Sequence, residues 1–157
     1  DFAGKVIDIV EESGLWDKVI FSSFDAKLLG ELKRKKKECR VGLLTFHEKM
    51  QVFEREMTAA FTAAYPGLDY RNILEGAGNK RHLVELVDGL DYKLDFLHPD
   101  YHSVLENPEL AMQMHARGIG VNPYTCDTAD EMMKLAALGC DGIITNRPDI
   151  ARQIFGA

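Results

Sequence analysis

The chain of 157 residues carries 19 Lys and Arg against 25 Asp and Glu, a formal net charge of −6, and 46% of its residues are hydrophobic. This composition is typical of one globular domain with a sizeable core, and the acidic balance argues against a general nucleic-acid-binding protein. We find no apolar run long enough for a membrane span, no signal-peptide pattern and no disulfide framework, because the three cysteines are widely spaced.

Patterns typical of helices and strands alternate from the first residue onward. Helical spacing of apolar residues predicts a helix over 2–12, and a short buried strand follows from Val19. Asp25 is placed to cap the next helix, which leads to a second strand over 41–45. The chain opens on Asp1 rather than Met, within a predicted helix, and we therefore expect it to be a piece of a longer protein.

The interval after the second strand is the longest, and it predicts a helical insertion over 48–90. Within it, helical periods cover 48–65 and about 80–87. Further strands are expected over 94–97, 119–125 and 142–145.

Sequence signals for helix ends support the later part of this assignment. Asn107 and Pro108 are expected to open a helix that runs to Arg117, Thr128 with Glu131 forms a capping box, and Pro148 starts the last helix. Five strand–helix alternations predict a parallel α/β sheet with crossover helices.

Polar and aromatic residues follow each apolar strand, at the end where parallel α/β proteins bind ligands. They form five short segments: 22–24, 45–47, 98–100, 124–127 and 145–147. This pattern predicts the face that carries the site, although Ser, Thr, Asp and Asn at such positions also serve as helix caps and turn residues.

Several segments together resemble the glycerophosphodiester phosphodiesterase family. VIFSSFD at Val19–Asp25 is similar to the family's strand v-i-x-S-F-d, and GLL at 42–44 fits the next strand. Leu97–Pro99 resembles the strand before the final helices, and VNPYTCD at Val121–Asp127 lies where the family has V-x-x-W-T-V-N. The most specific match is Met132–Pro148, which resembles M-x-x-L-x-x-x-G-V-D-G-I-I-T-D-R-P.

The sequence also departs from these family patterns. Tyr124 stands where the family has Trp, Asp127 where it has Asn, and Asn146 where it has Asp. The family's H-R-G, H-D, E-x-D and E-x-K motifs, which carry its two catalytic histidines and its metal carboxylates, have no counterpart here.

The resemblance implies a TIM-type (βα) barrel, with residues 1–157 forming one domain that holds about the last five strand–helix units. It further implies a metal-dependent phosphodiester hydrolase that converts glycerophosphodiesters to glycerol phosphate and an alcohol. No catalytic or metal-binding residue is carried over, so the ligands of the divalent cation (Ca or Mg) are expected outside this segment. The segment on its own is therefore expected to be inactive.

The resemblance points to Phe24, His98, Tyr124 and Arg147 as substrate-binding residues that form the pocket wall. Each has a plainer interpretation: core packing for the two aromatic residues, and a hydrogen-bonded histidine beneath a loop for His98. Arg147 is either a phosphate contact or a surface residue beside a helix start.

Other patterns favour structural roles. His98 and His102 have the spacing of two ligands on a helix, but Pro99 argues against a helix through His98 and hence against a metal site. The basic run over 33–37 is interpreted as a solvated helix end, and Cys126 and Cys140 as small buried residues.

Two alternatives remain to the hydrolase interpretation. The chain is also compatible with a non-catalytic α/β half-barrel that dimerises or binds a phosphorylated ligand, and less well with a sugar-phosphate barrel enzyme. In the first two interpretations, the N-terminal half of a barrel or a second copy must cover the open sheet edges. The expected partner is a small-molecule glycerophosphodiester, with no nucleic acid, and the few cysteines favour a cytoplasmic location without requiring it.

Overall fold

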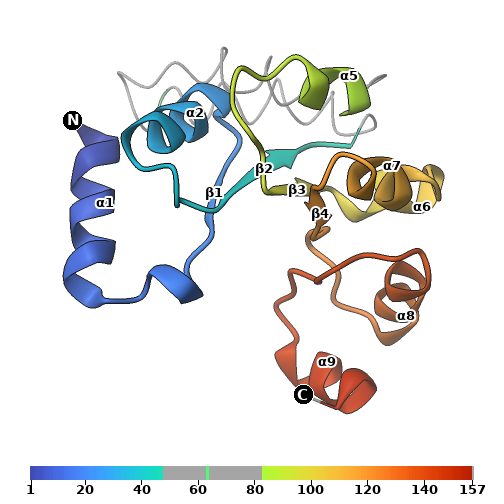
Figure 1. Cartoon of the computed structure of the whole chain (residues 1–157). Coiled ribbons are helices and arrows are strands. Elements are labelled where there is room, and N and C mark those ends of the chain that lie inside the picture. Colours follow the sequence, from blue (N-terminus) through green and yellow to red (C-terminus); the bar gives the residue numbers. More distant parts are fainter. Residues whose placement is uncertain (48–62, 64–82, 157) are drawn as a thin grey trace.

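The computed structural model describes residues 1–47, 63 and 83–156 (Figure 1). Its helices alternate with its strands along the chain, as the sequence predicts. The helices are α1 (Phe2–Ser13), α2 (Ala26–Lys35), α5 (Leu83–Asp88), α6 (Tyr101–Glu106), α7 (Leu110–His115), α8 (Ala129–Ala137) and α9 (Pro148–Phe155), with a 3₁₀ turn at Trp16–Lys18.

A four-stranded sheet with every pair parallel forms the centre of the described residues. Its strands are β1 (Phe21–Ser23), β2 (Val41–Thr45), β3 (Phe96–Pro99) and β4 (Gly120–Val121), in the order β1-β2-β3-β4. Each connection between neighbouring strands crosses over through helices, which confirms the predicted parallel α/β class.

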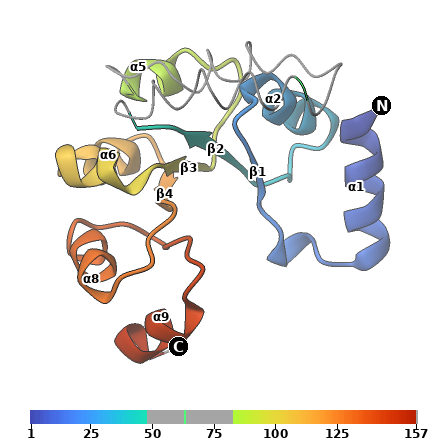
Figure 2. The same ribbon diagram turned by 180° about the vertical axis from the view of Figure 1, so that it is seen from behind.

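The two faces of the sheet differ in chemistry. The outer face buries apolar side chains at 0–1% exposure: Val41, Leu43, Leu97 and Val121. Figures 1 and 2 show the helices in an arc outside the sheet, where their apolar residues join these side chains in one core. Alternation along the strands therefore points the intervening residues to the opposite, inner face.

The inner face mixes polar and apolar residues and is only partly covered. It carries Ser22 on β1, Gly42 and Leu44 on β2, and Phe96 and His98 on β3. Ser22 is exposed and Leu44 and Phe96 are half-buried, whereas His98 is 3% exposed. Among the described residues, no strand pairs with the second edge of β1.

Side-chain caps begin the helices where the sequence places them. The Asp25 carboxylate accepts hydrogen bonds from the backbone of Lys27 and Leu28 at the start of α2. At α8, the Thr128 hydroxyl accepts from the backbone N–H of Glu131 at 3.4 Å, so Thr128 caps the helix as predicted, and it donates to the Glu131 carboxylate at 2.6 Å.

The predicted fifth strand over 142–145 is wrong as a strand. This segment is extended, and it is held to the chain after β4 by isolated backbone hydrogen bonds. The Ile144 N–H donates to Pro123 at 2.9 Å, and the Cys126 N–H donates to Ile144 at 3.1 Å. Because β4 itself is only two residues long, the ladder is too short to extend the sheet by another strand.

The predicted helix over 107–117 is also wrong at its start. Residues before it form α6, whose first turn is capped by Asp100, and Asn107 ends that helix instead of opening the next. The Pro108 ring pushes Asn107 to an extended conformation (φ −126°, ψ 83°), which stops α6, and α7 begins only at Leu110.

The predicted insertion over 48–90 falls mostly on residues outside those described, namely 48–62 and 64–82. Its last part forms α5 at Leu83–Asp88, which overlaps the helix expected over about 80–87, and the expected start near residue 80 lies outside the described residues. Within the described ranges, no helix is long and apolar enough to cross a membrane.

The basic run over 33–37 is less solvated than predicted. The Lys33 ammonium lies 2.7 Å from the Asp95 carboxylate, and the two side chains are 12% and 21% exposed. Asp95 also accepts a hydrogen bond from the Val41 N–H at 2.9 Å. Lys33 therefore ties α2 to the residues beside β2 and β3, while Arg34, Lys35 and Lys37 are exposed.

The structure predicts that Gly42→Ala destabilises the protein through a clash with His98. A Cβ atom at Gly42 would lie 2.3 Å from the imidazole Cε1, and the buried, hydrogen-bonded ring has little freedom to retreat. We expect the free energy of unfolding to fall by about 1–3 kcal/mol in urea titrations. In a His98→Ala background the same substitution should cost much less, and an equal cost in both backgrounds would contradict the explanation.

Candidate functional site

The carboxyl ends of the parallel strands meet at one edge of the sheet, here called the carboxyl edge. Phe24 follows β1, Phe46 and His47 follow β2, and Asp100 follows β3. Tyr124 comes three residues after β4 and forms an isolated parallel bridge with Asp100. This edge is the position where parallel α/β folds bind ligands.

Three half-buried rings form an aromatic cluster (Phe24, Phe46 and Tyr124) at the carboxyl edge. The Phe24 and Phe46 rings are stacked, with centroids 4.3 Å apart and planes inclined by 13°. Tyr124 meets Phe24 edge-on at 6.1 Å. The cluster brings together Phe24 and Tyr124, which the sequence singled out, and supplies an apolar wall with one hydroxyl.

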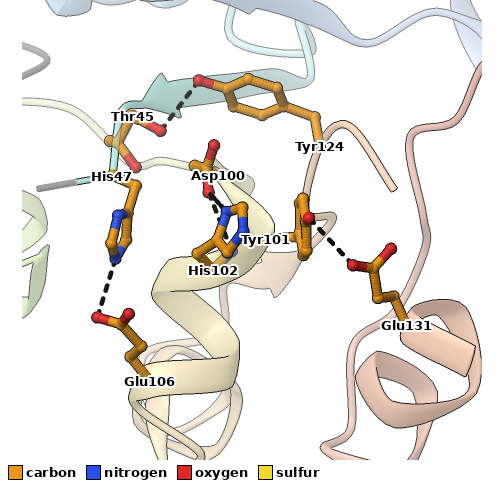
Figure 3. Close-up of polar contacts among 8 residues, drawn as sticks. All are labelled: Thr45, His47, Asp100, Tyr101, His102, Glu106, Tyr124 and Glu131. Carbon is orange, nitrogen blue, oxygen red and sulfur yellow. Dashed lines mark hydrogen bonds and ion pairs between the residues drawn. The ribbon is translucent and has the colours of Figure 1, made fainter. Parts of the chain in front are cut away.

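Backbone and side-chain hydrogen bonds hold Tyr124 in place. Its hydroxyl donates to the Thr45 carbonyl at 3.1 Å, a contact drawn in Figure 3, and its backbone N–H donates to Pro99 at 2.9 Å. Burial and the Asp100 carboxylate raise the pKa of the Tyr124 phenol. The phenol therefore stays protonated at neutral pH and acts as a hydrogen-bond donor.

A polar layer centred on the buried His98 lies beneath the aromatic cluster on the inner face. His98 Nδ1 lies 2.8 Å from the Ser22 hydroxyl oxygen, and the Asn122 amide nitrogen lies 3.4 Å from His98 Nε2. Because the amide nitrogen can only donate, Nε2 accepts, and the proton of the neutral ring is on Nδ1, which donates to Ser22. Phe24, Asp100 and Tyr124 each come two residues after a member of this layer and hence one step nearer the carboxyl edge.

Gly42 makes room for this layer, since the His98 ring lies over its Cα position. Burial lowers the pKa of His98 to about 4 from its ordinary value of 6.5. The imidazole is therefore neutral at physiological pH and serves as a fixed hydrogen-bonding group rather than a cation.

Further polar contacts surround the carboxyl edge, as Figure 3 shows. His47, after β2, pairs with Glu106 of α6 at 3.0 Å, and Tyr101 of α6 donates to Glu131 of α8 at 3.1 Å. At the start of α6, His102 Nδ1 pairs with the capping residue Asp100 at 2.9 Å. The Asp100 carboxylate also accepts from the backbone N–H of His102 at 2.9 Å. His98 lies in β3 and His102 in α6. The two histidines are therefore not ligands on one helix, as Pro99 indicated in the sequence.

Arg147 is exposed and lies at the start of α9 rather than against the aromatic cluster. Its Nε and Nη2 atoms donate to the two oxygens of Asp149 at 3.0 and 2.8 Å. This bidentate pair raises the pKa of the guanidinium and lowers that of the Asp149 carboxyl. The guanidinium is thus engaged by a carboxylate in this structure.

Two of the departures from the family patterns contact one another. The Asn146 side-chain amide donates to the Asp127 carboxylate at 3.1 Å, and the Asn146 backbone N–H donates to it at 2.8 Å. These hydrogen bonds, a third from Thr145 and the charge of Arg147 lower the pKa of Asp127.

The described residues do not match the chemistry of a divalent-cation site. No group of three or more His, Cys, Asp or Glu among them is arranged to hold a metal ion.

Cys126 and Cys140 are unsuited to nucleophilic attack. Burial raises the pKa of the Cys126 thiol, which is 0% exposed, and that of the Cys140 thiol to about 11. The described part of the carboxyl edge thus combines an apolar wall with polar groups that bond to one another.

Phe46 was missed by sequence reasoning as a member of this edge. Thr45–His47 was noted as a strand end, but the ring itself was not singled out. A signal was present, because Phe46 comes two residues after Leu44 and therefore points to the inner face, as Phe24 does two residues after Ser22.

Comparison with known proteins identifies what the chain is similar to. The family model described as "Glycerophosphoryl diester phosphodiesterase family" matches residues 1–150. A search of curated proteins finds no match.

Solved structures show the same fold at low sequence identity. A candidate glycerophosphoryl diester phosphodiesterase from Silicibacter pomeroyi matches 97% of this chain with 22% identity and a TM-score of 0.68. A glycerophosphodiester phosphodiesterase from Parabacteroides distasonis matches 97% with 17% identity and a TM-score of 0.65. An Oleispira antarctica phosphodiesterase, solved with its product sn-glycerol-3-phosphate, matches 88% with 16% identity and a TM-score of 0.58.

These matches cover only part of the known structures: 42%, 49% and 42% of the three chains, in the same order. This chain therefore spans less than half the length of these three proteins, and its sheet is part of a TIM-type (βα) barrel. The predicted fold class is confirmed.

Protonation of His98 should weaken the fold as the pH falls. Because the folded pKa lies below the unfolded value, the unfolded chain binds the proton first, so stability is full above about pH 6.5 and is lost towards pH 4. We expect His98 to account for about 2 kcal/mol of the difference in unfolding free energy between about pH 7 and about pH 4.5. His98→Gln, which cannot titrate, should show a correspondingly smaller difference in urea titrations at the two pH values. An equal difference in both proteins would contradict the assignment.

Proposed function

This chain belongs to the glycerophosphoryl diester phosphodiesterase family, and we propose that it is the C-terminal portion of a barrel that hydrolyses glycerophosphodiesters to glycerol phosphate and an alcohol. The observation that carries this proposal is the family match over 1–150, joined to a parallel sheet that aligns with phosphodiesterase structures. The product bound by the Oleispira antarctica relative, sn-glycerol-3-phosphate, supports this substrate class.

In this proposal, the aromatic cluster forms the apolar wall of the substrate site. The stacked rings of Phe24 and Phe46 would pack against the carbon skeleton of the substrate, and Tyr124 would add an edge held by Thr45. Rings at the ends of strands of a packed sheet lose little freedom on binding, which favours a shaped wall over a flexible one.

His98 and Arg147 remain proposed substrate contacts with different constraints. His98 is nearly buried, so its contribution would pass through the Ser22 hydroxyl that its Nδ1–H holds. Arg147 would exchange Asp149 for a substrate phosphate, and the exchange is inexpensive because both side chains of the pair are more than half exposed.

The catalytic acid and base and the ligands of the divalent cation, Ca or Mg, are proposed to come from the rest of the barrel. The partly covered inner face and the second edge of β1 support this arrangement, since parallel sheets are normally covered on both faces and protected at their edges. The N-terminal half of the barrel would cover them, as would a second copy in the alternative of a non-catalytic, dimerising half-barrel. The cytoplasmic location favoured by the sequence stays a prediction.

Hydrolysis should appear when the missing half of the barrel is restored. We suggest replacing, in the Parabacteroides distasonis relative, the segment that aligns with this chain by the chain itself. The chimera should release choline from glycerophosphocholine with Ca²⁺ or Mg²⁺ and lose this activity with a chelator, whereas the 157-residue chain alone should show none.

The outcomes of this assay separate the parts of the proposal. Chelator-sensitive hydrolysis by the chain alone would overturn its assignment as pocket wall without catalytic groups. A folded chimera that neither hydrolyses glycerophosphocholine nor binds sn-glycerol-3-phosphate would overturn the proposed activity.

Tyr124 substitutions in the chimera test the aromatic wall. Tyr124→Ala removes the ring edge beside Phe24, and we expect KM for glycerophosphocholine to rise by about tenfold with a smaller change in kcat. Tyr124→Phe keeps the ring and loses only the hydrogen bond to Thr45, so it should stay close to the parent. An unchanged KM in Tyr124→Ala would remove Tyr124 from the proposed wall.

A further inference from the structure

The extended segment 142–147 is attached to the sheet without being one of its strands. Backbone hydrogen bonds join it to residues 121–126: Asp141 donates to Val121 at 2.9 Å, in addition to the contacts between Ile144, Pro123 and Cys126 described above. These isolated bonds do not extend to Asn146 and Arg147. A different interaction must therefore set where the segment ends.

The Asp127 carboxylate provides that interaction. One oxygen accepts from the Thr145 hydroxyl at 2.9 Å and from the Asn146 backbone N–H at 2.8 Å, and the other accepts from the Asn146 side-chain amide at 3.1 Å. We call these three residues the Asp127 clasp. Hydrogen bonds to an ionised acceptor are stronger than neutral ones, so the clasp holds the end of the segment firmly against Asp127.

Two proposed substrate contacts lie directly beside the clasp. Tyr124 precedes Asp127 by three residues, and Arg147 follows Asn146, with its backbone N–H donating to the Thr145 hydroxyl at 2.9 Å. The clasp therefore joins the backbone before Arg147 to the segment that follows Tyr124.

We propose that Asp127 is a positioning residue that fixes the turn bearing Arg147 relative to the segment bearing Tyr124. The roles of Tyr124 and Arg147 in this statement rest on the proposed function, whereas the clasp itself does not. A carboxylate that merely capped a local turn would act on residues two or three positions away. Asp127 instead binds residues 18 and 19 positions later in the chain.

The side chains of Asp127 and Asn146 meet through their carboxylate and amide groups. Exchanging the carboxylate and the amide between the two positions therefore tests the contact. Asn146→Asp places a second carboxylate against that of Asp127, where the 3.1 Å hydrogen bond now lies. When both carboxylates are ionised, their repulsion should open the clasp. The double variant Asp127→Asn with Asn146→Asp again pairs one amide with one carboxylate, while the amide oxygen introduced at position 127 accepts from Thr145 and the backbone. It should restore the contact with its polarity reversed.

Hydrogen exchange and NMR on the chain measure the effect directly. In Asp127→Ala and, near neutral pH, in Asn146→Asp, we expect the backbone amide of residue 146 to exchange about tenfold faster than in the parent. The Tyr124 ring and Arg147 Nε–H resonances should shift in the same variants. The double variant should return both readouts towards the parent values, and the defect of Asn146→Asp should diminish near pH 4, where one carboxylate is protonated.

Asp130→Ala is the matched control, because Asp130 is an exposed carboxylate on α8 that pairs only locally with Lys134. It should leave the exchange and the Tyr124 and Arg147 resonances unchanged. The proposal is overturned if Asp127→Ala leaves them unchanged, or if the double variant fails to recover what Asn146→Asp loses. If Asp127→Ala does not fold, the comparison of Asn146→Asp with the double variant decides alone. An inactive chimera would leave these outcomes intact, so the two proposals fail separately.

Discussion

The parallel register of β2 and β3 is the constraint on which the rest of the site depends. It pairs His98 with Leu44, and Phe96 with Gly42. The His98 imidazole leans back over Gly42, the single position of β2 that has no side chain. From there its two ring nitrogens reach β1 and the residue after β4. One buried ring therefore connects three elements of the inner face, and its neutrality is a consequence of that burial.

The aromatic cluster is built on this layer by the alternation of the strands. Residues two positions further along β1 and after β4 point to the same face, so Phe24 and Tyr124 stand above Ser22 and Asn122. Phe46 then completes the cluster because β2 lies between β1 and β3. A shift of one residue in any strand would turn these side chains towards the helices. A side chain at Gly42 would bear on the site for another reason, because it would displace the His98 ring beneath the cluster.

Elements with local causes could be predicted well from the sequence, and elements that depend on distant partners could not. The Asp25 and Thr128 caps act within three residues, and both form as expected. Strand ends depend on which neighbour supplies hydrogen bonds, so the segment 142–145 has the composition of a strand without being one. The Asn107–Pro108 signal was correctly placed near a helix boundary but assigned to the wrong helix, because the cap at Asp100 starts α6 earlier.

The sequence by itself determined the parallel α/β class, the order of the elements and the edge where polar and aromatic side chains gather, because periodicity, capping and strand ends are local properties of the chain. It also carried the family resemblance and, by the absence of the family's catalytic motifs, the limit of that resemblance. Only the tertiary structure decided that His98 is buried and neutral, that Phe46 stacks on Phe24, and that Asp127 meets Asn146. These contacts join residues that are 19 or more positions apart, and sequence spacing alone does not specify which of them meet.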